Sequence, residues 1–385
     1  MRFFKSHVVK NLNRYLTVPS EGEERMVLFL ANTMTQLLNA IVIKKTLLQN
    51  ENCDVYYTEN LRDYATKAQE SGAFDNAYQI TLVKDICSRD SSVKRAIVRI
   101  KNALDFSLVK KMLPSDPMLY SRVYASGISL RNYEFYYAIK CKNSDVKLSL
   151  YEEGLCEYYT LGLPHSFARA LFSHLFFHHY YFEECDSVYV YAPGAVKNTW
   201  NNIAVKRIPG IYENSEIISL INKVFGYEPT ELKNAEDKVI ILEQSYYDEK
   251  QIKEQEEIIQ MLAEVFGKDR IIIKLHPRSE KNKYGSEYQY VNTKIPLEII
   301  ALNENIDRNN VFVSISSSSV LNFKMMLNRE PRILLLNKFL NPGADEGGSW
   351  HVFEYVRNAY SNDHFYMPVD KDDLLRVVKV LSQKN

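Results

Sequence analysis

The chain has 385 residues, of which 46% are hydrophobic and 25% are charged, and its 48 basic and 48 acidic side chains give a formal net charge of zero. This is the balance of a soluble globular protein that is long enough for two domains. A neutral chain has no global field that would gather a polyanion, so we expect no nucleic-acid partner.

The amino-terminal segment and the cysteines indicate a compartment. Five cysteines without a CxxC pair predict reduced thiols in a cytoplasmic protein. No run of about 18 apolar residues is present, so no membrane-spanning helix is expected. Residues 2–16 fit a basic amphipathic helix, and two roles stay open for it: peripheral contact with the inner face of the plasma membrane, or docking on the chain's own domain. A homodimer also stays open.

In the first half of the chain, short apolar segments alternate with segments of helical periodicity. The expected helices are TMTQLLNAIVIKKTLL (33–48), with Asn32 or Thr33 as its cap, and a segment rich in Phe and His near 165–180. The expected strands are 26–32, CDVYYTEN (53–60), TLVKDI (81–86), YEFYYAIKCK (133–142), VKLSLYEEG (146–154) and SVYVYAPG (187–194).

The pattern restarts after a connecting region, 208–232, that carries one helix. The expected strands are KVIILEQS (238–245), RIIIKLHPRS (270–279), NVFVSISSSSV (310–320) and PRILLLN (331–337). The helices between and after them are 248–267, 293–303, 320–328 and 371–385. Such alternation is typical of a parallel α/β sheet.

Two series of this kind predict an α/β protein with two Rossmann-like domains facing a central cleft. The predicted units are a basic segment (1–25), a first Rossmann-like domain (26–195), a second Rossmann-like domain (196–368) and a terminal helix (369–385) that is a candidate to cross back to the first domain.

The stretch KLHPR places basic and hydrogen-bonding side chains directly after an apolar strand. Ligands of open parallel sheets bind beyond the carboxyl ends of the strands, so Lys274, His276 and Arg278 are expected over the cleft. Pro277 restricts the backbone before it and would hold His276 in one direction. A strand-terminating His-Pro turn without chemistry is the alternative.

A run of four serines, Ser316, Ser317, Ser318 and Ser319, follows another apolar strand and precedes a helix. Backbone N–H groups at a helix start bind anions, and small hydroxylated residues add donors. Simple helix capping would need one serine, so we favour a phosphate site. Neither a GxGxxG nor a GxxxxGK[ST] motif is present.

An acidic pair and a glycine, Glu152, Glu153 and Gly154, end the strand that begins at Val146. Gly154 would permit a tight turn, and partial burial of one carboxylate would raise its proton affinity and make it a candidate general base. A charged surface turn is the alternative. Together the three stretches suit glycosyl transfer from a nucleotide donor, with a carboxylate on one side and a His and hydroxyls on the other.

At these residues the sequence resembles the bacterial sialyltransferases, which are marked by an acidic pair with a glycine, then His-Pro, then a serine or threonine run. LFLANTMTQLLNAI, KLHPR and SISSSSV also look like the lipooligosaccharide sialyltransferase family (glycosyltransferase family 52), and the related polysialyltransferases share all three motifs. The resemblance covers most of the chain after residue 25.

The resemblance implies a GT-B fold, a CMP-sialic acid donor, inversion at the anomeric carbon, and neither a metal ion nor another cofactor. It assigns Glu153 as the general base, His276 as a donor to the leaving phosphate, and Ser317 and Ser318 as phosphate ligands. Gln244, Asn32 and Thr33, at the ends of other strands, become candidates for donor binding. The implied acceptor is a galactose-type hydroxyl of a bacterial surface glycan or glycolipid, in lipooligosaccharide or capsule.

Other readings of the residues are weaker. His174 and His178 have the spacing of metal ligands on a helix, but no third ligand follows nearby, so no metal site is expected. The DKDD sequence at 370–373 opens the last helix, where aspartates favour the macrodipole. A transferase for another nucleotide sugar and a non-catalytic glycan-binding subunit remain the alternatives to a sialyltransferase.

Overall fold

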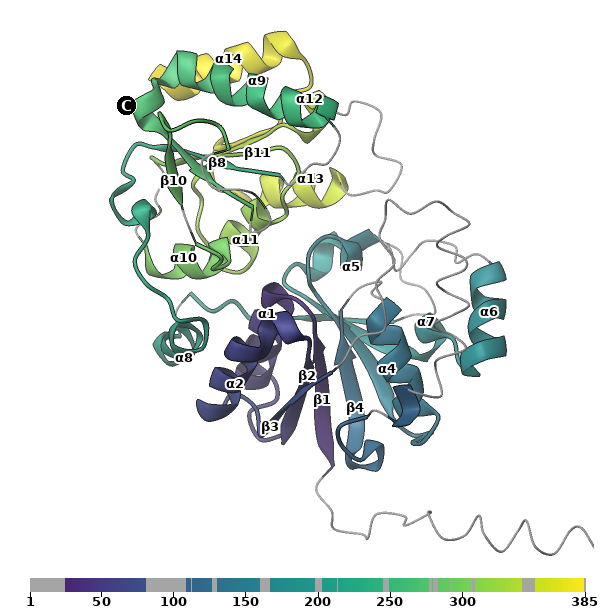
Figure 1. Cartoon of the computed structure of the whole chain (residues 1–385). Coiled ribbons are helices and arrows are strands. Elements are labelled where there is room, and N and C mark those ends of the chain that lie inside the picture. Colours follow the sequence, from purple (N-terminus) through teal and green to yellow (C-terminus); the bar gives the residue numbers. More distant parts are fainter. Residues whose placement is uncertain are drawn as a thin grey trace, which may run out of the picture.

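The computed structural model describes residues 25–80, 109–111, 113–126, 130–159, 167–197, 203–212, 214–244, 249–276, 279, 283–291, 293–304, 306, 309–340 and 350–383. These residues form two α/β units, each built on a parallel sheet (Figure 1). None of the helices in the described ranges is both long and apolar enough to cross a membrane. Residues 2–16, for which we predict an amphipathic helix, and the expected strand TLVKDI lie outside these ranges.

The first sheet has the strand order β3-β2-β1-β4-β5-β6-β7, with all neighbours parallel. Five residues of β1 (MVLFLA) are buried, as expected for a central strand covered on both faces. The strands are β1 Met26–Ala31, β2 Cys53–Tyr57, β3 Asn76–Gln79, β4 Tyr120–Ala125, β5 Lys147–Tyr151, β6 Cys185–Val190 and β7 Ala204–Arg207. The α-helices of this unit are α1 Met34–Thr46, α2 Arg62–Glu70, α4 Leu130–Lys140, α5 Cys156–Tyr159, α6 Phe167–Phe177 and α7 Tyr181–Glu184. Short 3-10 helices are η2 Glu59–Leu61, η3 Pro117–Leu119 and η5 Pro193–Ala195.

The second sheet has the order β10-β9-β8-β11-β12-β13, which repeats the winding of the first. Its strands are β8 Val239–Leu242, β9 Ile271–Lys274, β10 Gln289–Val291, β11 Val311–Ser314, β12 Arg332–Leu335 and β13 Phe365–Tyr366. Helix α8 Ser215–Phe225 follows β7 and connects the two units. The helices of the second unit are α9 Glu249–Phe266, α10 Leu297–Asn303, α11 Ser319–Met325, α12 Asn337–Leu340, α13 Trp350–Ala359 and α14 Lys371–Gln383, with the 3-10 turns η7 Glu231–Asn234 and η8 Lys268–Arg270.

Both sheets reverse their winding direction once, between β1 and β4 and between β8 and β11. Open α/β sheets bind ligands in the crevice at this reversal, outside the carboxyl ends of the strands. In Figure 1 the carboxyl end of the first sheet, with α1 and α5, lies opposite α10 and α11 of the second unit. The predicted arrangement of two Rossmann-like domains is confirmed.

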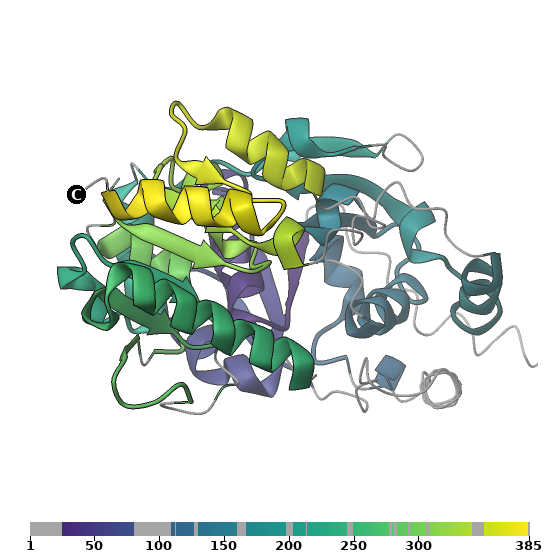
Figure 2. The ribbon, with the colours of Figure 1, turned by 90° about the horizontal axis from the view of Figure 1, so that it is seen from above.

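The two units share an apolar core. One cluster of buried side chains contains the core of the first sheet, the inward face of the second sheet and the buried faces of α8, α11 and α13. A second cluster lies between the other face of the second sheet and the helices α9 and α14, which run side by side on the outside of the molecule (Figure 2). The interface between the units is therefore a packed surface that borders the cleft.

One expected strand is a helix. YEFYYAIKCK contributes to α4, and the neighbouring strand is β4, which we do not predict from the sequence. Phe135, Tyr136 and Tyr137 are all buried in α4. Periodicity cannot distinguish a helix buried on all sides from a buried strand, and the high β-propensity of aromatic residues favours the wrong choice.

The predicted boundaries of the units also differ from the structure. The first sheet continues past residue 195, because β7 pairs with β6, and α8 packs against α1 and α2. The terminal helix α14 does not cross back: Leu374, Val378 and Leu381 recur at helical spacing and pack with α9 in the second unit. Contact with the first unit comes instead from α13, where His351 Nε2 lies 2.7 Å from the carbonyl oxygen of Ala195.

Candidate active site

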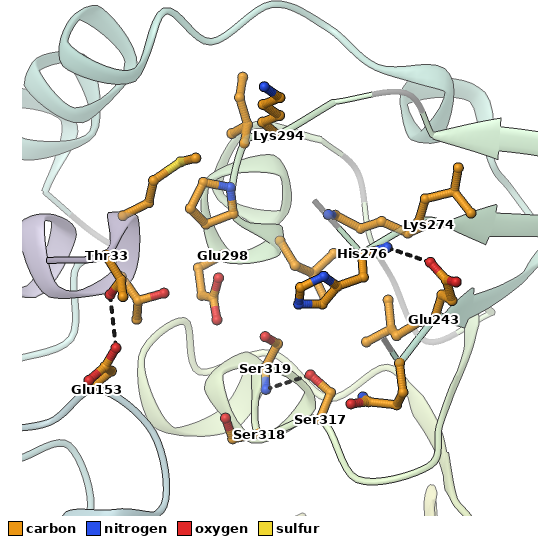
Figure 3. A pocket seen from close by; sticks show the side chains of 18 of the residues that line it. Thr33, Glu153, Glu243, Lys274, His276, Lys294, Glu298, Ser317, Ser318 and Ser319 are labelled. Atoms are coloured by element: carbon orange, nitrogen blue, oxygen red, sulfur yellow. Dashed lines mark hydrogen bonds between the residues drawn. The ribbon is translucent and has the colours of Figure 1, made fainter. Parts of the chain in front are cut away.

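A cavity of about 820 Å³ lies between the two units, at the carboxyl ends of both sheets. The first unit contributes residues after β1, in η2 and after β5, and the second unit contributes residues after β8, β9 and β11 and at the start of α10 (Figure 3). The lining residues from the first unit are Thr33, Met34, Thr35, Asn60 and Glu153. Those from the second unit are Leu242, Glu243, Gln244, Lys274, Leu275, His276, Lys294, Ile295, Pro296, Leu297, Glu298, Ser316, Ser317, Ser318 and Ser319.

The Glu153 carboxylate is held by three side-chain donors. Thr33 Oγ1 donates to Oε1 at 3.0 Å, while Gln36 Nε2 and Ser126 Oγ donate to Oε2 at 2.5 and 3.1 Å. The backbone N–H of Glu153 donates to Glu157 Oε2 at 3.3 Å. A carboxylate offers about four acceptor positions, so these bonds fix its orientation and leave Oε1 able to accept from a group in the cavity.

The first turn of α1 places two of these donors. Thr33 is the N-cap, and its hydroxyl accepts from the N–H of Gln36 at 3.2 Å. This resembles a Thr-x-x-Gln capping box, except that the Gln36 side chain accepts from the N–H of Asn32, one residue before the N-cap. The Thr33 hydroxyl that caps the helix therefore also donates to Glu153, in the turn formed by residues 152–154 after β5, which we call the acid turn.

Glu152, the first carboxylate of the predicted acidic pair, does not line the cavity. It is 3% exposed, and Oε2 accepts from the Tyr158 hydroxyl and, at 2.8 Å, from the N–H of Tyr191. Burial raises the pKa of Glu152 to about 8, with smaller contributions from the nearby carboxylates of Glu157 and Glu298. Its role in the fold is to join the end of β5 to the segment after β6.

Glu152→Gln is expected to change the pH dependence of stability. The folded-state pKa is about 8, above the usual value of about 4.3, so the stabilising contribution is complete below the usual value and is lost as the pH rises through about 8. The amide resembles the protonated acid and cannot ionise, so the variant keeps this stabilising contribution as the pH rises. The variant should gain ~3 °C or more in melting temperature relative to the wild type between pH 5 and pH 9, measured by differential scanning fluorimetry. A difference that is constant across this range would contradict the prediction.

His276 lies at the end of β9 and lines the cavity opposite Glu153 (Figure 3). Its backbone N–H donates to Glu243 Oε2 at 2.8 Å. Glu243 is buried, and its Oε1 accepts from Lys283 Nζ at 3.2 Å and from the Tyr284 hydroxyl at 3.0 Å. Pro277 and Arg278, the other predicted residues of this turn, lie outside the described residues.

The four serines reach the cavity from the turn between β11 and α11. The N–H of Ser317 donates to Ser314 Oγ at 2.8 Å, and the N–H of Ser319 donates to Ser317 Oγ at 3.3 Å. These bonds use acceptor positions on the hydroxyls and leave their protons free to rotate toward a ligand.

Gly154 meets the serine turn across the cleft. A Cβ built on it would lie 3.4 Å from Ser318 Oγ, which is an ordinary van der Waals contact between the two units. We expected it to permit a tight turn, and residues 153–155 form a bend between β5 and α5, although the φ of Gly154 does not lie in the left-handed region.

Charged side chains line the part of the cavity that belongs to the second unit. Lys274 ends β9, and burial lowers its pKa. Glu298, in the first turn of α10, is 4% exposed and accepts from Asn322 Nδ2 at 2.8 Å. Gln244 is fixed through its backbone, which exchanges two hydrogen bonds with the Gln255 side chain.

Several of these residues are missing from the sequence-based predictions. Glu243 precedes the predicted Gln244 at the same strand end, and Glu298 follows Pro296 at a helix start. The position of each residue at the end of a strand or the start of a helix could have indicated a place at the cleft. Asn32, in contrast, was predicted and does not line the cavity: its N–H donates to Gln36 Oε1 at 2.5 Å and its carbonyl accepts from Asn60. Within the described residues, no three His, Cys, Asp or Glu side chains are grouped closely enough to hold a metal ion.

Comparison with known proteins gives a family and a fold. A family model described as "Alpha-2,8-polysialyltransferase (POLYST)" matches residues 27–335. No curated protein matches the chain in sequence.

Two solved structures cover most of the chain at low sequence identity. The crystal structure of an alpha/beta-galactoside alpha-2,3-sialyltransferase from the luminous marine bacterium Photobacterium phosphoreum matches with a TM-score of 0.53 and 12% identity, over 89% of this chain and 98% of that chain. UGT89C1 of Arabidopsis thaliana in complex with UDP-L-rhamnose matches with a TM-score of 0.54 and 11% identity, over 94% and 89% of the two chains. At these identities the likeness shows the fold, which is GT-B as predicted.

Proposed function

Because the chain belongs to the alpha-2,8-polysialyltransferase family, we propose that it transfers sialic acid from CMP-sialic acid to a hydroxyl of a bacterial surface glycan, with inversion and without a metal ion. The observation that supports this proposal most directly is that Glu153, His276 and the serine turn, which come from different units, line one cavity. A nucleotide-sugar donor and a glycan acceptor are the two substrates of such an enzyme.

Glu153 is the proposed general base. The acceptor hydroxyl donates its proton to Oε1 as its oxygen forms a bond to the anomeric carbon of the sugar. Thr33, Gln36 and Ser126 hold the carboxylate while this happens. Because the carboxylate reaches the cavity from the first unit, the acceptor approaches the donor sugar from that side.

The leaving group is proposed to lie against the second unit. The bond from the anomeric carbon to the phosphate oxygen breaks with its electron pair on the phosphate, and CMP departs. His276 and the hydroxyls of Ser317 and Ser318 are the donors that stabilise the phosphate as its charge develops. Because the acceptor hydroxyl enters from the first unit and CMP departs toward the second, the configuration at the anomeric carbon is inverted.

Lys274 and Glu298 extend this donor site. Lys274 supplies a buried amino group; burial lowers its pKa, while the Glu298 carboxylate favours its charged form. Glu298 has one oxygen engaged by Asn322 and a second that can accept from a ribose hydroxyl. A phosphodiester carries a single negative charge, which a cation, an imidazole and hydroxyls can stabilise. These side chains therefore support transfer without a divalent metal ion.

The test is a screen of nucleotide sugars with the purified chain in the presence of EDTA. We expect CMP release from CMP-sialic acid at an unchanged rate in the chelator, because the proposed donors to the phosphate are side chains. Release of UDP or GDP from another sugar nucleotide would favour a different donor. Strict dependence on added Mn²⁺, or no turnover of any donor, would overturn the proposal.

The acceptor is resolved by the same assay with two glycans. We propose a galactose-type hydroxyl, tested with lactose. The description of the matched family names an alpha-2,8 linkage, which favours a second candidate, the 8-hydroxyl of a terminal sialic acid, tested with sialyllactose. Mass spectrometry of the products separates single addition from chain extension.

A further inference from the structure

Gln36 supports the proposed base from behind the cavity. It lies in the first turn of α1, is 1% exposed and does not belong to the cavity lining, whereas Thr33, Met34 and Thr35 do. Its Nε2 donates to Glu153 Oε2 at 2.5 Å, across 117 residues of sequence. An effect of the Gln36 side chain on a bound substrate must therefore act through its two partners, the Glu153 carboxylate and the turn at Asn32.

The orientation of the Gln36 amide is determined by its partners. The N–H of Asn32 lies 2.5 Å from Oε1 and can only donate, so the atom it contacts must be the amide oxygen. The NH₂ group then has to face the carboxylate. A flip of the amide would place two donors against each other and the amide oxygen against Glu153.

The two oxygens of Glu153 consequently differ. Oε2 accepts from Gln36 and from Ser126, while among the described side chains Oε1 accepts from Thr33, which itself lines the cavity. We propose that Gln36 is a positioning residue that occupies Oε2 and thereby directs Oε1 to receive the proton of the acceptor hydroxyl. This inference rests on the proposed role of Glu153 as base.

A second side chain of α1 fixes the backbone of the acid turn. Asn39, one turn after Gln36, donates through Nδ2 to the carbonyl oxygen of Glu152 at 2.7 Å and accepts from the Tyr191 hydroxyl at 2.9 Å. Thr33, Gln36 and Asn39 recur every three residues and share one helix face. This face holds the peptide before Glu153 as well as its carboxylate.

The charge state of the acid turn depends on several neighbours, which any pH experiment must consider. Titratable groups near Glu153 come from β5, the acid turn, α5 and the opposite side of the cavity. They are Tyr151, Glu152, Cys156, Glu157, Glu243, Lys274, His276, Lys294 and Glu298. A substitution at Gln36 leaves all of these groups in place, so a change in the pH profile reports on the new contact.

Gln36→Glu tests the inference by replacing the donor with a second carboxylate. Two carboxylates in this contact share one proton. While the acid at position 36 holds that proton, it donates to Oε2 as the amide does, and Glu153 stays ionised. Loss of the proton removes this hydrogen-bond donor and places two negative charges in contact, so kcat/KM for CMP-sialic acid is expected to acquire a new alkaline limb, above which activity falls about tenfold or more. Below this limb activity should stay near that of the wild type, while CMP binding measured by calorimetry stays within about twofold of wild type.

A matched control and a second variant complete the experiment. Gln49→Glu makes the same change at an exposed site just beyond the end of α1 and should leave the profile unchanged. Gln36→Met removes the hydrogen-bond donor to Glu153 without adding charge. It should lower kcat about tenfold or more at an unchanged KM for CMP-sialic acid. This variant also tests the role of Gln36 if Gln36→Glu does not fold.

The outcomes separate this inference from the function on which it rests. An unchanged pH profile in Gln36→Glu, or full kcat in Gln36→Met, while Glu153→Gln is inactive, would overturn the role of Gln36 alone. An active Glu153→Gln would overturn the proposed base itself.

Discussion

Glu153→Gln is expected to reduce kcat by about 10²–10⁴-fold, the usual contribution of a positioned general base. The amide retains the size of the side chain but cannot accept the proton of the acceptor hydroxyl. The Gln36 amide, held by Asn32, keeps the new carbonyl oxygen at the Oε2 position, so the turn should keep its geometry. The measurement is the steady-state rate of CMP release with saturating acceptor.

Two further measurements give this prediction its specificity. Binding of CMP should change little, because the carboxylate lies on the acceptor side of the cavity. Glu70→Gln, an identical change at an exposed position at the end of α2, should have wild-type activity. A Glu153→Gln enzyme that keeps more than about a tenth of wild-type kcat would be inconsistent with a base at this position.

His276→Ala is expected to lower kcat by about 10²–10³-fold, as found when one donor to a developing negative charge is removed. In contrast to Glu153→Gln, it should also weaken CMP binding, because the imidazole is proposed to contact the phosphate in both ground and transition states. The Glu243 carboxylate holds the backbone N–H of residue 276, and this contact does not involve the ring. The turn should therefore survive the substitution.

The readout for His276→Ala is the pair of kcat and the dissociation constant for CMP. His174→Ala, on α6, removes an exposed imidazole that contacts Glu183 and serves as the matched control. If His276→Ala neither lowers kcat nor raises the dissociation constant for CMP, the leaving phosphate does not contact this side chain, and the sugar donor must lie elsewhere in the cavity.

The order of chemical groups along the chain was enough to predict the family. An acidic pair, a His-Pro dipeptide and a serine run each follow an apolar segment, and the family match confirms the resemblance to bacterial sialyltransferases and polysialyltransferases. Each of these groups lies at the end of a parallel strand, and the carboxyl ends of parallel strands meet at one edge of a sheet. Local sequence therefore predicted the acid pair, His276 and Ser317 as neighbours of one cleft.

Residues that act by contact with these groups were not predicted. Gln36 and Glu243 support Glu153 and the backbone of His276, and nothing in their own neighbourhoods relates them to a residue 117 or 33 positions away. The Thr-x-x-Gln pattern at Thr33 predicts a helix cap, which the structure contains. The Thr33 hydroxyl also contacts Glu153, and this second contact depends on the packing of α1 against the acid turn.

The sequence by itself determined the α/β alternation of most segments and the chemistry available at the strand ends, because both depend on residues close together in the chain. The strand pattern could not decide which carboxylate of the acid pair enters the cavity, and Glu153 was singled out only by the family resemblance. Adjacent residues after a strand point in opposite directions, and the choice was made by Tyr158 and Tyr191, which bind Glu152 in the interior, and by α1, which binds Glu153 at the cleft. Only the tertiary structure brings these partners together, because the free energy that selects one carboxylate comes from contacts between segments distant in the sequence.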